Sequence, residues 1–587
     1  DFLLPAHAAR LFELELPRPL VTTGFYSIHL QVKTQDTSAK GIGSLVVVEP
    51  AQKRDPFFGV TGYGLFDEYL PALQMIGVGT AGHVFNWNAI EPQQGVFNWP
   101  DQRIDLLLKS GFRVIGGIVL MGYHGQPAWI NSVVRKKEAE GIAFPFDKQY
   151  FQARRNLATA IAKHYKDRIR EFSIIEEIDI AQHHRPYEHD HYVRGVRETS
   201  AGIKEIDPGI HVTAIGVASP DFAANPPMQS LKHYFSLLHD CIDSISYDFY
   251  ISPIVFGPGR PRPSPEKSRF REKLLETVRL SRAHGKARFA IDEAGFALVQ
   301  NLPADSEEAI ALAAAMLRSF ILARSVPEMH HWLYFKVKNG IALEDWFLWN
   351  QDDNPMPVVA AYATAANRLA FVEKPEAIDL HDDIQCYLFQ KEESQLLAIW
   401  SSSEDTIAFS FHMSENSQRF DFMSSATSEK AGKVQLNLSG RPIFLQSNCS
   451  RDDFKQALLS AVFSLPEVKA DFYRSDQSSI QLFLLNQVDR ELPLTIICNQ
   501  QKLDATLLPG GKKTLTLLQA RQTDKEIVHC EIQSPEQTYS FQKELSTTAV
   551  LPVISDSLSE DTLDEFAGQK ANVEMKDNEF LFPVDAQ

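Results

Sequence analysis

Short apolar runs alternate with longer stretches of helical periodicity between residue 57 and about residue 372. Runs that read as strands lie at 57–62, 81–87, 113–120, 171–177, 211–216, 243–248, 287–293 and 330–336. Stretches with a helical period lie between them, at 101–110, 150–168, 191–206, 228–240, 266–284 and 305–325. Strands that are apolar along their length are typical of a parallel sheet buried on both faces. Eight strand–helix units predict an α/β protein built on a (β/α)8 TIM barrel.

The segments on either side of this region have the period of two that is typical of strands. Residues 1–54 are expected to form an N-terminal β segment or a truncated β module, and 55–372 the barrel. Residues 373–451 are expected to form a β-sandwich packed on the barrel, and 452–552 a second, immunoglobulin-like sandwich. The acidic, polar residues 553–587 predict a poorly ordered linker or tail.

Charge and composition narrow the function classes. The chain has 587 residues, and 58 Lys+Arg against 75 Asp+Glu give a net charge of −17. Nucleic-acid binding needs clustered positive charge, so it is not expected. The most apolar stretch, 309–323, is broken by Arg318, so no membrane span is expected either. Aromatic residues make up 10% of the chain, which suits a carbohydrate ligand.

The cysteines and the first residue bear on processing and location. Five scattered cysteines, without C-x-x-C or a histidine at zinc spacing, predict neither a disulfide framework nor a zinc site. The chain starts at Asp1 without Met, which favours a processed or truncated start, and a secreted or periplasmic location is expected. The sequence does not indicate an oligomeric state.

Two predicted strands end in acids. Glu176 and Glu177 close the fourth strand, and Asp292 and Glu293 close the seventh. Functional groups of a TIM barrel lie at the C-terminal ends of its strands. A retaining glycosidase needs two carboxylic acids there, one that protonates the leaving oxygen and one that attacks the anomeric carbon. Spacing alone leaves a second interpretation open, in which these acids form structural ion pairs at the rim.

The residues around these acids carry a family resemblance. Residues 85–99 read FNWNAIEPQQGVFNW, similar to the W-x-x-I-E-P-x-x-G-x-(F/Y)-x-W stretch of clan A glycoside hydrolases, the retaining β-glycosidase barrels. Residues 122–129, GYHGQPAW, resemble the clan's P-x-W turn, and 246–250, SYDFY, resemble its H-x-Y. The run RPIFL at 441–445 resembles the accessory domain of families such as 39. The resemblance covers about residues 57–446 and implies hydrolysis of a β-glycosidic bond without a cofactor.

The resemblance also implies roles for individual residues. Glu177 would be the acid/base and Glu293 the nucleophile, although a shift of one residue would make Glu176 the acid. Tyr250 would hydrogen-bond the nucleophile, and Trp332 would form the floor of the sugar site. Further substrate contacts are expected from His83, Trp87, Trp129, Asp248 and Trp346.

Three residues depart from the clan pattern. Glu176 stands where the clan has Asn, His83 where it has Arg, and Asp248 where it has His. These changes indicate a subsite for a 2-amino sugar, compensatory drift in an ordinary β-glycoside site, or lost catalysis. A catalytically degenerate barrel that acts as a carbohydrate-binding protein is therefore the alternative function. The loop 182–191 contains four histidines and two acids, which leaves a metal site there as a further alternative to a substrate-contacting loop.

Overall fold

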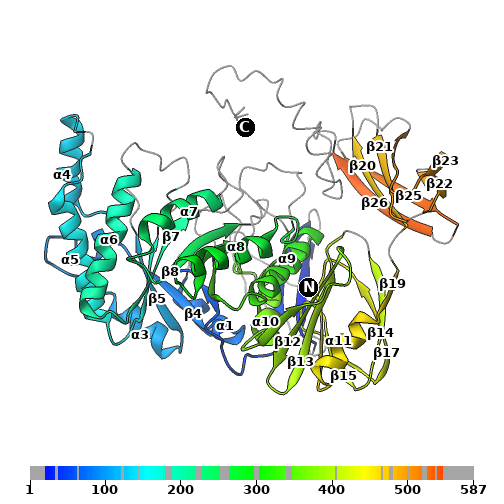
Figure 1. The fold of residues 1–587 in the computed structure, drawn as a ribbon, viewed down its shortest axis with the longest axis horizontal. Coiled ribbons are helices and arrows are strands. Elements are labelled where there is room, and N and C mark those ends of the chain that lie inside the picture. Colours follow the sequence, from blue (N-terminus) through cyan, green and yellow to red (C-terminus); the bar gives the residue numbers. More distant parts are fainter. Residues whose placement is uncertain are drawn as a thin grey trace. The chain divides into compact units, whose positions relative to one another are not determined.

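The computed structural model describes residues 20–546 except for 21, 34–37, 63–64, 120–124, 143, 176–177, 179–187, 218–226, 251–263, 296–302, 339–346, 404–405, 465–466, 475–479, 489, 499–500, 518–524 and 536–537. The chain forms two compact units, one reaching Val462 and the other beginning at Phe463 (Figure 1). Among the described helices, none is both long and apolar enough to pass through a lipid bilayer.

The first unit contains a closed barrel of eight parallel strands in the order β10-β3-β4-β5-β6-β7-β8-β9. The strands are β3 (Phe58–Val60), β4 (Thr80–Phe85), β5 (Arg113–Val119), β6 (Glu171–Ile175), β7 (His211–Val217), β8 (Ser244–Tyr250), β9 (Phe289–Gly295) and β10 (Met329–Tyr334). Each strand overlaps one of the predicted runs, so the predicted fold class is confirmed. In this closed order β6 and β10 lie opposite each other, and contacts between their side chains cross the barrel interior.

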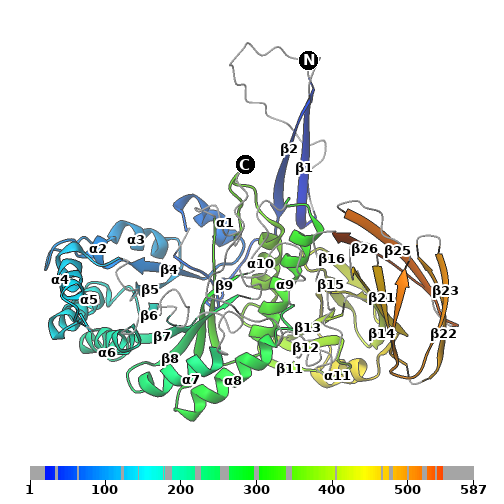
Figure 2. The ribbon, with the colours of Figure 1, turned by 90° about the horizontal axis from the view of Figure 1, so that it is seen from above.

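Helices surround the barrel (Figures 1 and 2). They are α1 (Leu70–Met75), α2 (Trp87–Ile90), α3 (Asp101–Lys109), α4 (Ala128–Ala139), α5 (Lys148–Tyr165), α6 (Glu188–Ile206), α7 (Pro227–Leu238), α8 (Phe270–Ala283), α9 (Glu307–Arg324) and α10 (Pro357–Arg368). The sequence pattern did not predict α4 or α10. In α4 only Ile130 and Val134 are buried, whereas α10 is buried on almost every side. Both helices therefore lack a clear apolar stripe opposite a polar face.

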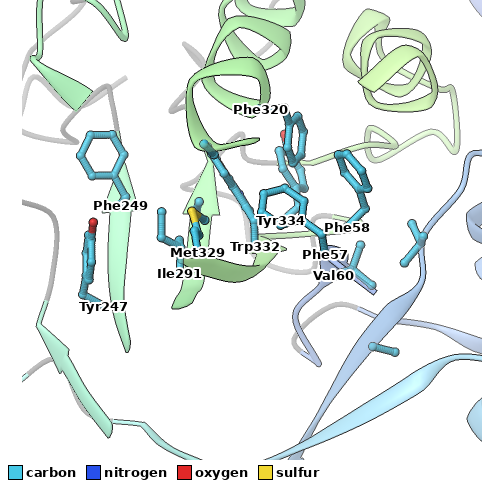
Figure 3. Close-up of a cluster of buried hydrophobic side chains, with 14 of the residues drawn as sticks. Phe57, Phe58, Val60, Tyr247, Phe249, Ile291, Phe320, Met329, Trp332 and Tyr334 are labelled. Atoms are coloured by element: carbon cyan, nitrogen blue, oxygen red, sulfur yellow. The ribbon is translucent and has the colours of Figure 1, made fainter. Parts of the chain in front are cut away.

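Aromatic side chains fill the layer between the barrel and helix α9. Phe58 of β3 and Trp332 of β10 both pack against Phe320 of α9, with ring centroids 5.3 and 4.8 Å away (Figure 3). All three side chains are almost completely buried. These strands therefore turn their large apolar side chains outward to the helices, which leaves smaller and polar side chains for the barrel interior.

An antiparallel hairpin precedes the barrel, formed by β1 (Gly24–Lys33) and β2 (Ser38–Val47) (Figure 2). It is attached close to the start of α10. The Ser44 backbone amide donates to Asn354 Oδ1 at 3.2 Å, and the Ser44 hydroxyl donates to the Pro355 carbonyl at 2.7 Å. The N-terminal β segment is thus a two-stranded hairpin held to the barrel region.

Two sheets follow the barrel, with strand orders β11-β12-β13-β18-β15-β16 and β17-β14-β19. Their strands are β11 (Glu373–Ala377), β12 (Ile384–Lys391), β13 (Ser394–Ser401), β14 (Ile407–Met413), β15 (Ser417–Phe420), β16 (Ala426–Glu429), β17 (Gly432–Leu438), β18 (Ile443–Ser447) and β19 (Val462–Ser464). Helix α11 (Arg451–Leu459) belongs here, because Phe454 packs against Phe411 of β14. Helix α11 therefore lies in the first compact unit, which extends to Val462.

The second unit contains the sheets β20-β21-β24 and β23-β22-β25-β26. The strands are β20 (Val468–Arg474), β21 (Ile480–Asn486), β22 (Leu492–Cys498), β23 (Gln501–Leu507), β24 (Lys512–Leu517), β25 (Lys525–Gln533) and β26 (Thr538–Ser546). Cys498 and Cys530 form a disulfide between β22 and β25. The expectation of no disulfide is wrong for this pair, because antiparallel pairing brings together cysteines that lie 32 residues apart. The predicted tail at 553–587 lies outside the described residues.

Candidate active site

The acids predicted to be catalytic lie at or near the ends of two barrel strands, β6 and β9. Strand β6 ends at Ile175, directly before Glu176 and Glu177, and both glutamates lie outside the described residues. Strand β9 is described through Gly295 and therefore includes Glu293, whose side chain is half-buried. The chain positions of these acids correspond to the C-terminal end of the barrel, where TIM-barrel enzymes have their active sites.

A β-bulge in β9 determines where Glu293 points. Tyr247 of β8 pairs with Ile291, but the next residue, Asp248, pairs with Glu293, so Asp292 is the extra residue. Asp292 faces the barrel interior, because it accepts hydrogen bonds from Ser173 of β6 and His331 of β10. Strict alternation would then turn Glu293 toward the helices, whereas a bulge re-aims the following side chain. Glu293 therefore lies on the interior side of the strand.

Asp248 shares this side of the barrel. Its neighbour Phe249 faces the helices, with its ring centroid 4.3 Å from that of Phe270 in α8. Alternation along β8 then turns Asp248 to the interior, where it is 1% exposed. The structure thus brings Asp248 and Glu293 together in register at one end of the barrel. Tyr250 lies in register with Gly295, and its side chain is outside the described residues.

Trp332 lies in the core, and not in an open sugar site. Its ring packs against Phe320 of α9 and Phe270 of α8, and only 1% of the side chain is exposed (Figure 3). Both helices lie outside the barrel, so the ring points away from Glu293. The expectation that Trp332 forms the floor of the sugar site is corrected by this placement.

The strand-two motif forms a hydrogen-bonded loop. Glu91 accepts a hydrogen bond from Trp87 Nε1 at 2.8 Å and a second from the Gly95 backbone amide, also at 2.8 Å. The indole of Trp129 donates to the Glu91 carbonyl at 3.1 Å. Trp87 is buried, and the Arg154 guanidinium lies 5.2 Å from its ring centroid. The Trp, Glu and Gly of the motif are therefore explained by loop geometry, whereas Trp129 remains half-buried.

His83 is not brought next to Glu293. Its ring centroid is 4.8 Å from that of Phe85, and Phe85 packs against Tyr165 of α5 on the outside of the barrel. His83 shares that outer face of β4. Burial lowers the pKa of His83 to about 4, so the ring is neutral at neutral pH. Trp346 lies outside the described residues.

The histidine-rich loop contributes no joint site from its described part. His189 and His191 both lie on α6, but His189 Nδ1 is 3.3 Å from the Tyr234 hydroxyl, whereas His191 Nε2 is 2.8 Å from the Tyr150 hydroxyl. His191 is buried, and burial together with the charge of Arg154 lowers its pKa to about 3. His183 and His184 lie outside the described residues.

A polar cluster lies in the barrel interior, from the first residues of β5, β6 and β10 as far as Asp292 in the middle of β9, and sequence reasoning missed it. It contains Arg113, Glu171, Ser173, Asp292, His330 and His331. Burial alone would raise the pKa of Glu171, but the hydrogen bond with His330 and the nearby histidine and arginine side chains lower it well below its ordinary value. The available signals were Glu171 and Ser173 at alternate positions of an apolar strand, and two adjacent histidines in another strand.

The fold of this chain is similar to that of a family 39 glycoside hydrolase. The solved structure of that enzyme, from Bacteroides cellulosilyticus WH2, matches with a TM-score of 0.54 and 17% identity over 72% of this chain and 88% of the other. A glucosidase from Croceicoccus marinus matches with a TM-score of 0.47 and 11% identity, over 68% of this chain and 97% of the other. A family 39 enzyme from Xanthomonas axonopodis pv. citri matches with a TM-score of 0.45 and 12% identity, over 68% and 95%.

Sequence-level comparisons add nothing to this likeness. No protein-family model matches the chain, and no curated protein matches it. At 17% identity the first structural match establishes a shared fold. Fold alone does not determine a reaction, so the function has to be argued from the site.

Proposed function

We propose that the protein is a retaining glycoside hydrolase that cleaves a β-glycosidic bond by double displacement. The observation that carries this proposal is the inward placement of Glu293 near the C-terminal end of β9, directly after a bulge and in register with Asp248 of the neighbouring strand β8. Glu176 and Glu177 follow the last residue of β6, which lies in the same closed barrel. The similarity of the fold to a family 39 glycoside hydrolase supports the same reaction class.

In this proposal Glu293 attacks the anomeric carbon of the bound sugar, while Glu177 protonates the departing oxygen. A glycosyl ester on Glu293 is then hydrolysed by water, from which Glu177 removes a proton. Retention requires the two carboxyl groups to be about 5–5.5 Å apart, close enough for direct attack. Glu176 is the alternative acid, because it is adjacent in the chain.

The direct test is covalent labelling with mechanism-based 2-fluoro β-glycosides, followed by peptide mapping. The proposal predicts one glycosyl group on the peptide that contains Glu293. A screen of 2-hydroxy and 2-amino β-glycosides, with the product anomer followed by NMR, identifies the substrate class and the stereochemistry. Binding of oligosaccharides without hydrolysis or labelling would instead favour a carbohydrate-binding protein, and an inverted product would exclude Glu293 as the nucleophile.

We also propose that the protein is secreted or periplasmic. The disulfide between Cys498 and Cys530 supports this location, since structural disulfides persist mainly in oxidising compartments. Thiol labelling of the protein as isolated from its native source tests the proposal. A blocked Cys498–Cys530 pair supports export, whereas two free thiols contradict it.

A further inference from the structure

A second cluster of interest lies at the N-terminal end of the barrel strands. Glu171 is the first residue of β6, and His330 and His331 are the second and third residues of β10. Their ligand atoms, one from each side chain, all lie within 4.8 Å of one another. Because β6 and β10 are opposite in the closed barrel, these atoms meet in the barrel interior.

A bulge in β10 allows two adjacent histidines to face the same side. Met329 pairs with Phe289 and Trp332 with Ile291, so three steps along β10 correspond to two steps along β9. In a regular strand neighbouring side chains point to opposite faces. Here His330 and His331 both reach Glu171 Oε1, from 2.9 Å (His330 Nε2) and 3.4 Å (His331 Nδ1).

The hydrogen bonds of the two rings define which nitrogens carry protons. His330 Nδ1 lies 2.9 Å from the Phe289 carbonyl, which can only accept, so Nδ1 carries the hydrogen. His331 Nε2 lies 3.0 Å from Asp292 Oδ1 and donates to that carboxylate. In neutral rings the remaining nitrogens, His330 Nε2 and His331 Nδ1, therefore present lone pairs to Glu171 Oε1. Three electron-rich atoms face one another at this point, which a cation between them would stabilise.

The surroundings have the form of a metal site. Metal-binding histidines usually donate their second N–H to a carbonyl or carboxylate, as Phe289 and Asp292 provide here. The His331 side chain is 0% exposed, and its Nδ1 has no hydrogen bond to any atom that the structure describes. Arg113 donates to Glu171 Oε2 at 3.3 Å, which leaves Oε1 for the metal. Tetrahedral Zn²⁺ with Zn–N of about 2.0–2.1 Å separates its ligand atoms by roughly 3.3 Å, close to the 2.9 and 3.4 Å between Glu171 Oε1 and the two histidine nitrogens.

We propose that Glu171, His330 and His331 bind a divalent transition metal of the Zn²⁺ class, with water in the remaining position. The metal would connect opposite sides of the barrel near the N-terminal ends of β6 and β10, a placement that suits a structural role. This proposal does not depend on the glycosidase proposal. The rival arrangement is a proton on His330 Nε2, which would form an ion pair with Glu171 and require no metal.

The test uses the full chain, stripped with chelator and titrated with Zn²⁺ by calorimetry and with Co²⁺ by visible absorption. The expected result is one tight site per chain, the intense absorption of tetrahedral cobalt, and a rise in the thermal midpoint on adding Zn²⁺. Asp292→Asn, which replaces the carboxylate that accepts from His331 Nε2 and from the Ser173 hydroxyl, is expected to weaken binding by about 10–100-fold. Glu171→Gln, which removes a ligand charge, is expected to weaken binding at least as much.

A matched control separates this cluster from the histidine-rich loop. The double variant His183→Gln/His184→Gln is expected to keep full binding, because neither residue belongs to the cluster. If the wild-type chain binds no metal and shows no tetrahedral cobalt spectrum, the proposal is overturned in favour of the protonated ion pair. It is also overturned if binding is lost in the loop variant but retained in Asp292→Asn. The wild-type titration decides the question even if Glu171→Gln does not fold.

Discussion

Asp248 and Glu293 lie in register at the ends of neighbouring strands β8 and β9, and both face the barrel interior. Their pairing exists because Asp292 is an extra residue in β9. Without the bulge, Glu293 would take the face that Ile291 occupies, toward the helices. The extra residue Asp292 thus turns the Glu293 side chain from the helix-facing side of β9 to the barrel interior, where it can contact a ligand. Bulges near active sites commonly re-aim a side chain in this way.

The first prediction concerns Glu293. Replacing it by Gln removes the nucleophilic oxygen while keeping the size of the side chain. The proposed mechanism then predicts that kcat falls by several orders of magnitude, whereas circular dichroism and the thermal midpoint change little. Glu272→Gln, an exposed position on α8, is the control and should keep full activity. Near-normal turnover by the Glu293 variant would remove this residue from the mechanism.

A second prediction tests the core placement of Trp332. Its ring is buried between Phe320 and Phe270, so Trp332→Ala should lower the free energy of unfolding by about 3–5 kcal/mol. Trp332→Phe keeps much of the buried apolar area and should lose roughly half as much or less. Urea unfolding measures both. A small effect of the Ala variant on stability, together with a large rise in KM, would instead place the ring in a sugar site.

The loop of the strand-two motif gives a third prediction. In Glu91→Gln the amide has one acceptor oxygen for two donors, the buried Trp87 Nε1 and the Gly95 amide, so one of the two donors loses its partner. The expected loss of unfolding free energy is about 1.5–3 kcal/mol. Gln94→Ala, an exposed change in the same loop, should stay within about 0.5 kcal/mol of the wild type. Equal stability of the two variants would contradict this role of Glu91.

The fourth prediction is a pH dependence that arises from His191. Its pKa is lowered to about 3 in the folded protein, against about 6.5 when unfolded. The unfolded chain therefore binds an extra proton between these values, so stability is lost as pH falls below about 6.5, by about 2 kcal/mol at pH 5. His191→Gln should show a shallower fall than the wild type in urea titrations between pH 8 and pH 5. Parallel curves for the two proteins would contradict this assignment.

The fifth prediction concerns the disulfide of the second unit. Its cysteines lie 32 residues apart, and closing a loop of this size should stabilise the unit by about 3–4 kcal/mol. Reductant should therefore lower the thermal midpoint of this unit in the wild type but not in Cys498→Ala/Cys530→Ala. Cys241→Ser, which alters a cysteine outside the disulfide, should keep the wild-type response to reductant. A midpoint insensitive to reductant in all three proteins would contradict a stabilising role.

Much of the architecture is encoded locally. Each barrel strand is a short apolar run flanked by helical stretches, so the strands and the barrel class follow from periodicity and from the count of units. The same pattern places Glu293 at a strand end. Periodicity did not predict helix α10, because this helix is buried on almost every side and has no polar face. It also could not predict the disulfide between Cys498 and Cys530, because that pairing depends on how strands distant in sequence align.

The barrel, its flanking strands and the acids at the strand ends follow from the pattern of residues along the chain. The faces that those residues take depend on how the strands pair in three dimensions. Two bulges set these directions, one placing Asp292 and Glu293 together inside the barrel and the other placing His330 and His331 there. A bulge depends on how a strand pairs with both neighbours, which are distant in sequence. The orientation of Trp332 also depends on a bulge. The register of β10 after its bulge turns the Trp332 ring toward helix α9 and away from Glu293.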